Sequence, residues 1–124
     1  MGEFVRSHQK LDAWKLAVRF VVSIYESTQD FPKSELYGLT SQLRRAAVSI
    51  PTNIAEGAAR DSQKEYLRFL SIARGSLSEV ETELIIAAEL GYLSNDGKLR
   101  NELDVVSQKL SGLIRYVRNN DRPT

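Results

Sequence analysis

The chain has 124 residues, of which 42% are hydrophobic and 27% charged, the balance of one soluble globular domain spanning residues 1–124. It contains no cysteine and a single histidine, His8, which excludes disulfides, a thiol nucleophile and almost any imidazole-based metal site. With a net charge of only +1, any affinity for nucleic acid must depend on where the charges lie.

Apolar residues at three-and-four spacing predict a first helix over about residues 11–29. Phe31-Pro32 ends it, because proline cannot continue a helix and disfavours helical geometry in the residue before it. The same apolar spacing resumes after Pro32 and predicts a second helix over about residues 33–60. It continues through 49-SIPTNIAEG-57, a stretch that otherwise resembles a loop.

A third helix is predicted over about residues 63–90. Ser62 and Glu65 match a capping box at its start, and Gly91 suits the left-handed position after its end. A fourth helix is predicted over about residues 98–118, after the turn signal Asn95-Asp96-Gly97.

Four helices joined by short connections predict an all-α fold, an antiparallel up-down-up-down four-helix bundle. No apolar run approaches the roughly 20 residues that span a bilayer. The N-terminal residues also lack the apolar core of a signal peptide. We therefore predict a cytoplasmic protein without membrane contact.

Pro51 lies inside the second predicted helix. It has no amide proton and clashes with the carbonyl of Ala47, which predicts a kink in this helix. Ser49 is expected to act as a local cap. The Asn53 side chain is expected to donate to a carbonyl that the kink frees.

Gly57 follows Pro51 by less than two turns and, with its alanine neighbours, predicts a close approach of two helix backbones. Gly75 and Ser76 of the third helix are the expected contact. Glu56 is then expected to be partly buried and paired with Arg60 or Arg74. The alternative is a functional polar site around Asn53 and Glu56.

Basic residues on the second and third helices are the candidate nucleic-acid contacts. Grouped positive charge binds phosphates because it releases their counterions. Three of these residues are expected near one end of the bundle and the others further along it. The candidates are Arg44, Arg45, Arg60, Lys64, Arg68 and Arg74. The alternative is that they form solvated faces and ion pairs between subunits.

The third helix carries its basic residues in its first half and Glu79, Glu81, Glu83 and Glu89 in its second. This order opposes the helix dipole, so partners outside the helix are expected. They belong either to a second subunit packed head to tail or to other helices of the same bundle.

Catalytic chemistry finds little support in the sequence. Glu79 and Glu83 share one helix face, but a di-iron bundle needs histidines that the chain lacks, which leaves a two-carboxylate Mg²⁺ site as the alternative. We predict no enzyme, no cofactor and no metal. His8 is expected to be solvated. The aromatic residues on or beside the apolar stripes, Trp14, Tyr25, Tyr66 and Phe69, are expected in the core or an interface, with stacking of a nucleic-acid base on Tyr66 as the alternative.

The segments QLRRAAVSIPTNIAEGAAR (42–60) and EYLRFLSIARGSLSEVETEL (65–84) resemble the four-helix bundle proteins encoded in bacterial 23S rRNA intervening sequences. LDAWKLA (11–17) and FPKSELYGLTSQL (31–43) fit the same pattern. The resemblance implies a non-enzymatic protein that assembles as a homopentamer. The family is also similar to the accessory variability protein of diversity-generating retroelements, a basic pentamer that binds nucleic acid and a reverse transcriptase.

Two functions are therefore expected. The first is a homo-oligomeric bundle, a pentamer by resemblance, that binds structured RNA or DNA as an accessory to a partner enzyme such as a reverse transcriptase. The second is an oligomeric scaffold that binds protein and has no role with nucleic acid.

Overall fold

The computed structural model describes residues 8, 11–94 and 97–120. Within them, four α-helices make up almost all of the regular structure: α1 (Asp12–Thr28), α2 (Leu39–Ala58), α3 (Gln63–Glu89) and α4 (Lys98–Asn119). The all-α class and the four helices are thus confirmed. Asn95 and Asp96 of the predicted turn, together with residues 1–7 and 121–124 at the ends, lie outside the described residues.

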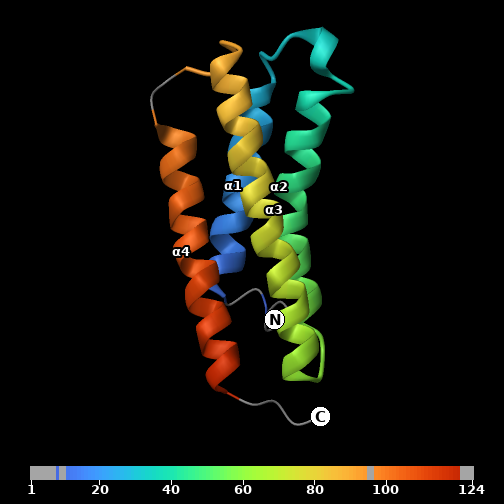
Figure 1. The fold of residues 1–124 in the computed structure, drawn as a ribbon, viewed down its shortest axis with the longest axis vertical. Coiled ribbons are helices and arrows are strands. Elements are labelled where there is room, and N and C mark those ends of the chain that lie inside the picture. The colour runs from blue at the N-terminus through green and yellow to red at the C-terminus, as the bar shows by residue number, and fades with distance from the viewer. Residues whose placement is uncertain (1–7, 9–10, 95–96, 121–124) are drawn as a thin grey trace, which may run out of the picture.

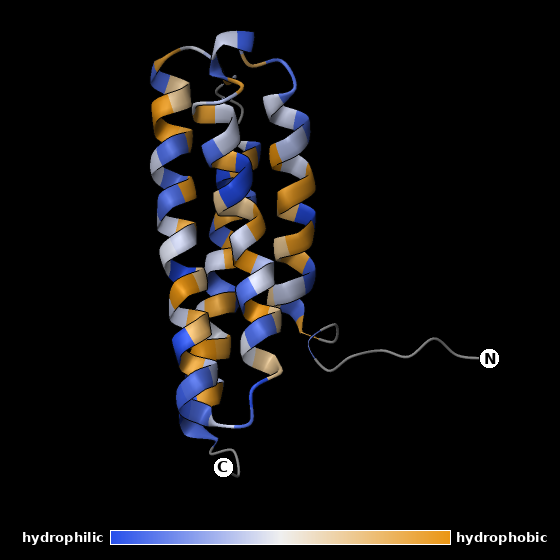
Figure 2. Ribbon diagram, turned by 90° about the vertical axis from the view of Figure 1, so that its right-hand side faces the viewer, coloured by the Kyte–Doolittle hydropathy of each residue, from blue (hydrophilic) through white to orange (hydrophobic). Residues whose placement is uncertain are grey.

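The helices form an elongated bundle in which each runs opposite to the one before it (Figure 1). α2 packs against α1 and α3, and α4 completes the bundle between α3 and α1. Each helix carries alternating hydrophobic and polar segments (Figure 2), because only one side of it faces the core. Phe20, Ile24, Leu43, Ile50 and Leu70 are among the fully buried side chains.

The second predicted helix differs from the structure at its start. Lys33–Glu35 form a short 3-10 helix, η2, and α2 begins only at Leu39. Gly38 has a non-helical backbone, with φ −116° and ψ −113°, and the Glu35 carboxylate accepts a hydrogen bond from the Leu39 amide at 3.1 Å. Leu36, which follows η2, is exposed.

The start and end of α3 follow local sequence signals. The Ser62 hydroxyl accepts a hydrogen bond from the Glu65 amide at 3.1 Å, which confirms one half of the predicted capping box. Gly91 has φ +80°, and the amides of Gly91 and Tyr92 donate to the carbonyls of Ala88 and Ala87. This is a Schellman motif, and it confirms the expected left-handed glycine.

Helix α2 continues through Pro51, as the uninterrupted apolar spacing predicted. The Asn53 side chain donates to the Ser49 carbonyl at 2.8 Å and to the Ser49 hydroxyl at 2.9 Å. Asn53 thus binds a carbonyl, as expected, but this carbonyl belongs to Ser49. The carbonyl that loses its amide partner because of Pro51 is that of Ala47. The kink at Pro51 stays a prediction.

Candidate nucleic-acid interface

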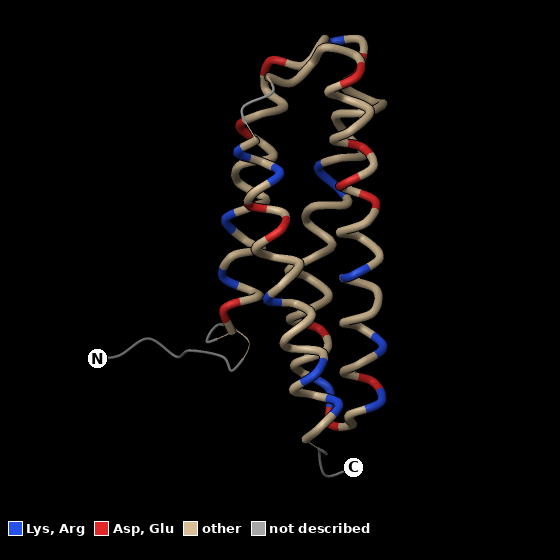
Figure 3. Tube along the Cα trace, turned by 60° about the vertical axis from the view of Figure 1, so that its left-hand side comes forward, with Lys and Arg blue, Asp and Glu red and all other residues tan. Residues whose placement is uncertain are grey.

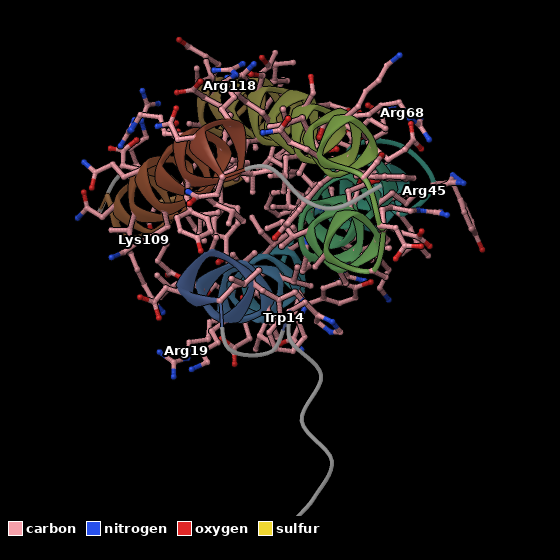
Figure 4. All side chains as sticks on the ribbon, turned by 90° about the horizontal axis from the view of Figure 1, so that it is seen from below. Trp14, Arg19, Arg45, Arg68, Lys109 and Arg118 are labelled. Carbon is pink, nitrogen blue, oxygen red and sulfur yellow. The ribbon has the colours of Figure 1, made fainter. Side chains whose placement is uncertain are left out.

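Three of the six predicted basic residues lie close to the short turn between α2 and α3. Arg60 directly follows α2, and Lys64 and Arg68 lie on the first two turns of α3. All three are exposed. Lys and Arg gather at this lower end of the molecule (Figure 3), and Arg68 points outward when the bundle is seen from below (Figure 4).

Phe69 lies between these basic residues and contacts two of them. The central guanidinium carbon of Arg68 lies 4.4 Å from the Phe69 ring centroid, and that of Arg60 lies 4.9 Å from it. Both distances are within the range of a cation–π interaction. Phe69 itself is half-buried, so the two arginines and the ring form one surface feature shared by α2 and α3.

Each of the two arginines is also ion-paired on its own side of the turn. Arg60 Nη2 donates to Glu56 Oε2 at 2.8 Å, and Arg68 donates through Nε and Nη2 to the two oxygens of Glu65 at 3.1 Å each. The hydrogen bond from Arg68 lowers the pKa of Glu65, and the same bond raises the pKa of Arg68. Each carboxylate therefore pairs with a guanidinium that also lies against the Phe69 ring.

Glu56 departs from the prediction in one respect. Its expected pairing with Arg60 is confirmed, but its expected burial is wrong, because half of the Glu56 side chain is exposed. Gly57 and Ala58 beside it are buried, whereas Glu56 itself is exposed to solvent.

Gly57 lies against α3 at Tyr66 and Phe69. A Cβ atom on Gly57 would lie 3.0 Å from Tyr66 Cδ1, 3.1 Å from Phe69 Cβ and 3.1 Å from the Tyr66 carbonyl oxygen. The close backbone approach predicted for Gly57 is thus confirmed, but its partner is different. This approach brings the end of α2, with Arg60, to the Phe69 ring.

The predicted partner, Gly75, has open space around it, so its expected contact with Gly57 is wrong. Two antiparallel helices joined by a tight turn bring together residues equally far from the turn. Gly57 therefore meets Tyr66, whereas Ser76 meets Ser49, with 2.9 Å between their hydroxyl oxygens. Together with Asn53, these two serines form a polar link between α2 and α3 rather than a separate functional site.

The other three predicted basic residues do not join this end. Arg44 donates from Nε to the Thr28 hydroxyl at 2.9 Å and lies over the Tyr25 ring at 4.6 Å, which ties α2 to the end of α1. Arg45 is exposed on the second turn of α2 and points outward when the bundle is seen from below (Figure 4). Arg74 is exposed about 9 Å beyond Arg68 along α3.

Two residues at this end were missed by sequence reasoning. Phe69 was expected in the core or an interface, because its position beside an apolar stripe does not indicate that part of its ring reaches the surface. Arg118 comes from α4, whose last turn packs beside the start of α3: Gln63 Nε2 donates to the carbonyls of Val117 and Arg118 at 2.7 and 3.0 Å. The available signal was the spacing of Arg115 and Arg118, which lie three residues apart near the end of the fourth predicted helix and are therefore neighbours on its surface.

Tyr66, the residue weighed for base stacking, is only 4% exposed and belongs to the core. The alternative of stacking on Tyr66 is therefore wrong. His8, expected to be solvated, is half-buried, and its ring packs edge-on against Trp14 with 5.1 Å between centroids.

Among the described residues, no group of three histidine, aspartate or glutamate residues that could hold a metal ion comes together. Glu83 is buried, and its Oε1 has no hydrogen-bond partner among the described residues. Burial, reinforced by the nearby charge of Glu79, raises the pKa of Glu83.

A cavity lies at the opposite end of the bundle. Its volume is about 510 Å³, and it opens between α3 and α4, with leucines in its lining and both acidic and basic residues around it. Arg100 there is held by Glu81 at 3.1 Å and by Asp104 at 3.8 Å. This mixture of charges makes the cavity a poor phosphate site compared with the basic end. No described helix is long and apolar enough to cross a membrane.

The fold is shared with a solved structure, a protein of unknown function from the S23 ribosomal protein family of Bacteroides thetaiotaomicron. The TM-score is 0.76 at 20% sequence identity, and the similarity covers 83% of this chain and 95% of that one. No curated protein matches the chain. The model of the 23S rRNA-intervening sequence protein family matches residues 9–112, and the chain therefore belongs to this family.

Proposed function

We propose that the protein is a non-enzymatic homo-oligomer that binds structured RNA or DNA through the end of the bundle formed by the α2–α3 turn and the last turn of α4. The observation that carries the proposal is the grouping of Arg60, Lys64, Arg68 and Arg118 at this end. They come from three different segments, yet they lie around one turn.

Three acidic residues at this end, Glu56, Asp61 and Glu65, offset part of this charge within each chain. A pentamer, which resemblance to the family suggests, would present five copies of the basic end to one nucleic acid. Several weak contacts on one assembly then raise the overall affinity well above that of a single site. Binding as an accessory to a partner enzyme such as a reverse transcriptase, in the cytoplasm, belongs to the same proposal.

Binding of a structured RNA should fall steeply between about 50 and 200 mM salt, because phosphate contacts release counterions. Replacing Arg60 and Arg68 together by alanine should lower the slope of log affinity against log salt by about 2. Filter binding or a mobility shift measures both effects. The variant Arg19→Ala with Lys33→Ala loses the same charge elsewhere and should keep the slope. Absence of any binding at low salt contradicts the proposal.

Oligomerisation is supported by an exposed apolar stripe on α1. Val18, Val22 and Tyr25 are spaced four and three residues apart and are all exposed, and Val48 of α2 is exposed as well. Light scattering should give a mass several times the 14.0 kDa of one chain, and five times for a pentamer. A single species of monomer mass at micromolar concentration would contradict this prediction.

The same stripe favours a second candidate function, an oligomeric scaffold whose exposed apolar face binds protein. Under this alternative the basic end serves solubility and contacts between subunits. The salt titration separates the two functions, since a scaffold gives no salt-dependent binding of RNA that responds to Arg60 and Arg68.

A further inference from the structure

We propose that Arg60, Arg68 and Phe69 form a stacking platform for the unpaired bases of single-stranded RNA or DNA. This inference rests on the proposed nucleic-acid function and deepens it, since it names which form of nucleic acid the basic end recognises. Under it the arginines act through the flat faces of their guanidiniums, beside the Phe69 ring, as well as through their positive charge.

The hydrogen-bonded edges of both arginines support this assignment. A guanidinium grips a phosphate with two parallel N–H groups along one edge. Arg68 already uses the edge formed by Nε and Nη2 for both oxygens of Glu65, and Arg60 uses Nη2 for Glu56. The occupied edge of Arg68 favours contact with a nucleotide through the face of its guanidinium.

Those faces are oriented and reachable. The Arg68 and Arg60 guanidiniums lie over the Phe69 ring at 4.4 and 4.9 Å, and 56% and 46% of their side chains are exposed. An exposed arginine that lies against an aromatic ring in this way resembles the aromatic and guanidinium platforms on which nucleic-acid bases stack. Bases inside a duplex present only their edges, so a platform of this kind selects unpaired bases.

The neighbouring residues supply the rest of such a site. Lys64 is exposed one helical turn before Arg68 and is placed to meet the phosphate of a stacked nucleotide. Gly57 allows α2 to approach Phe69 closely enough for Arg60 to reach the ring. The platform therefore depends on the packing of α2 against α3 and not on either helix alone.

The test compares the whole protein with a variant that keeps every charge. Arg60→Lys with Arg68→Lys preserves two positive charges but removes both planar groups. Arg45→Lys with Arg74→Lys makes the same change at two exposed arginines away from Phe69. Fluorescence anisotropy measures binding to labelled single strands of about 12 nucleotides, as RNA and as DNA, and to the corresponding duplexes.

The unaltered protein should bind single strands about 10-fold or more tightly than duplexes. The Arg60→Lys, Arg68→Lys variant should lose that preference while keeping its salt slope, and the Arg45→Lys, Arg74→Lys variant should retain it. The unaltered protein should quench the fluorescence of 2-aminopurine in the single strand, because the base stacks on the platform. Phe69→Leu, with circular dichroism to verify its fold, should also weaken the preference.

Binding with equal affinity for single strands and duplexes, or a preference that survives Arg60→Lys with Arg68→Lys, overturns the platform and leaves the proposed function standing. Absence of binding to every probe at low salt overturns both. A preference for RNA over DNA, or the reverse, identifies which single strand the platform takes.

Discussion

Gly57→Ala should lower the free energy of unfolding by about 1–2 kcal/mol, although alanine is the better helix former. The added Cβ would lie 3.0–3.1 Å from Tyr66 Cδ1, Phe69 Cβ and the Tyr66 carbonyl oxygen, so α2 and α3 must move apart. Gly57→Leu should cost about 3 kcal/mol or more, because the larger side chain has no space at all. Chemical denaturation followed by circular dichroism measures both losses.

Gly75→Ala is the matched control on the facing helix. Gly75 is exposed, lies inside α3 and has no atom within 4 Å of the position of an added Cβ. This substitution should raise the free energy of unfolding by roughly 0.5–1 kcal/mol, the helix-propensity difference between glycine and alanine. Equal effects at Gly57 and Gly75 would contradict the packing account of the SIPTNIAEG stretch.

Glu83→Gln should raise the free energy of unfolding at pH 7, on the order of 1 kcal/mol, which is the scale for an uncompensated buried polar group. Glu83 is only 5% exposed, and its Oε1 is unpartnered within the described residues. Glutamine keeps the shape of the side chain and removes the charge. Thermal denaturation of both proteins across a pH series measures the difference.

The pH dependence follows from the direction of the shift. Burial and the charge of Glu79 raise the pKa of Glu83 above its usual value of 4.5. The folded protein therefore holds this proton more tightly than the unfolded chain does. Its stability falls as pH rises from about 4.5 through the raised pKa, and this loss is complete above it.

The advantage of Glu83→Gln should therefore be present at pH 7 and vanish near pH 4, where both side chains are neutral. Glu89→Gln, at an exposed position of the same helix, should change stability by less than about 0.5 kcal/mol at either pH. A loss of stability in Glu83→Gln at pH 7 would contradict the prediction and show that the carboxylate has a cationic partner in the assembled protein.

Much of the fold follows from local sequence signals. The apolar spacing gave the four helices, because a helix presents every third and fourth residue to the same side. Ser62 and Gly91 marked the start and end of α3, since capping and left-handed geometry depend on a few neighbouring residues. The pairing of Glu56 with Arg60 was also predictable, because residues four apart on a helix are neighbours.

The start of α2 was less predictable. The apolar spacing extended the helix back to Pro32, but the backbone at Gly38 breaks it, and the Glu35 side chain caps the new start. That cap depends on a three-residue 3-10 turn, which periodicity does not distinguish from the first turn of a helix.

The sequence by itself determined the helices, the caps of α3 and the presence of basic residues near its start. Only the tertiary structure decided which of these residues meet. The register of α2 against α3 put Gly57 on Tyr66 and left Gly75 open, and it placed Arg60 and Arg68 over Phe69. The physical reason is that spacing along one helix fixes the side on which a residue lies. Contacts between helices depend on the register and distance at which the two helix surfaces pack.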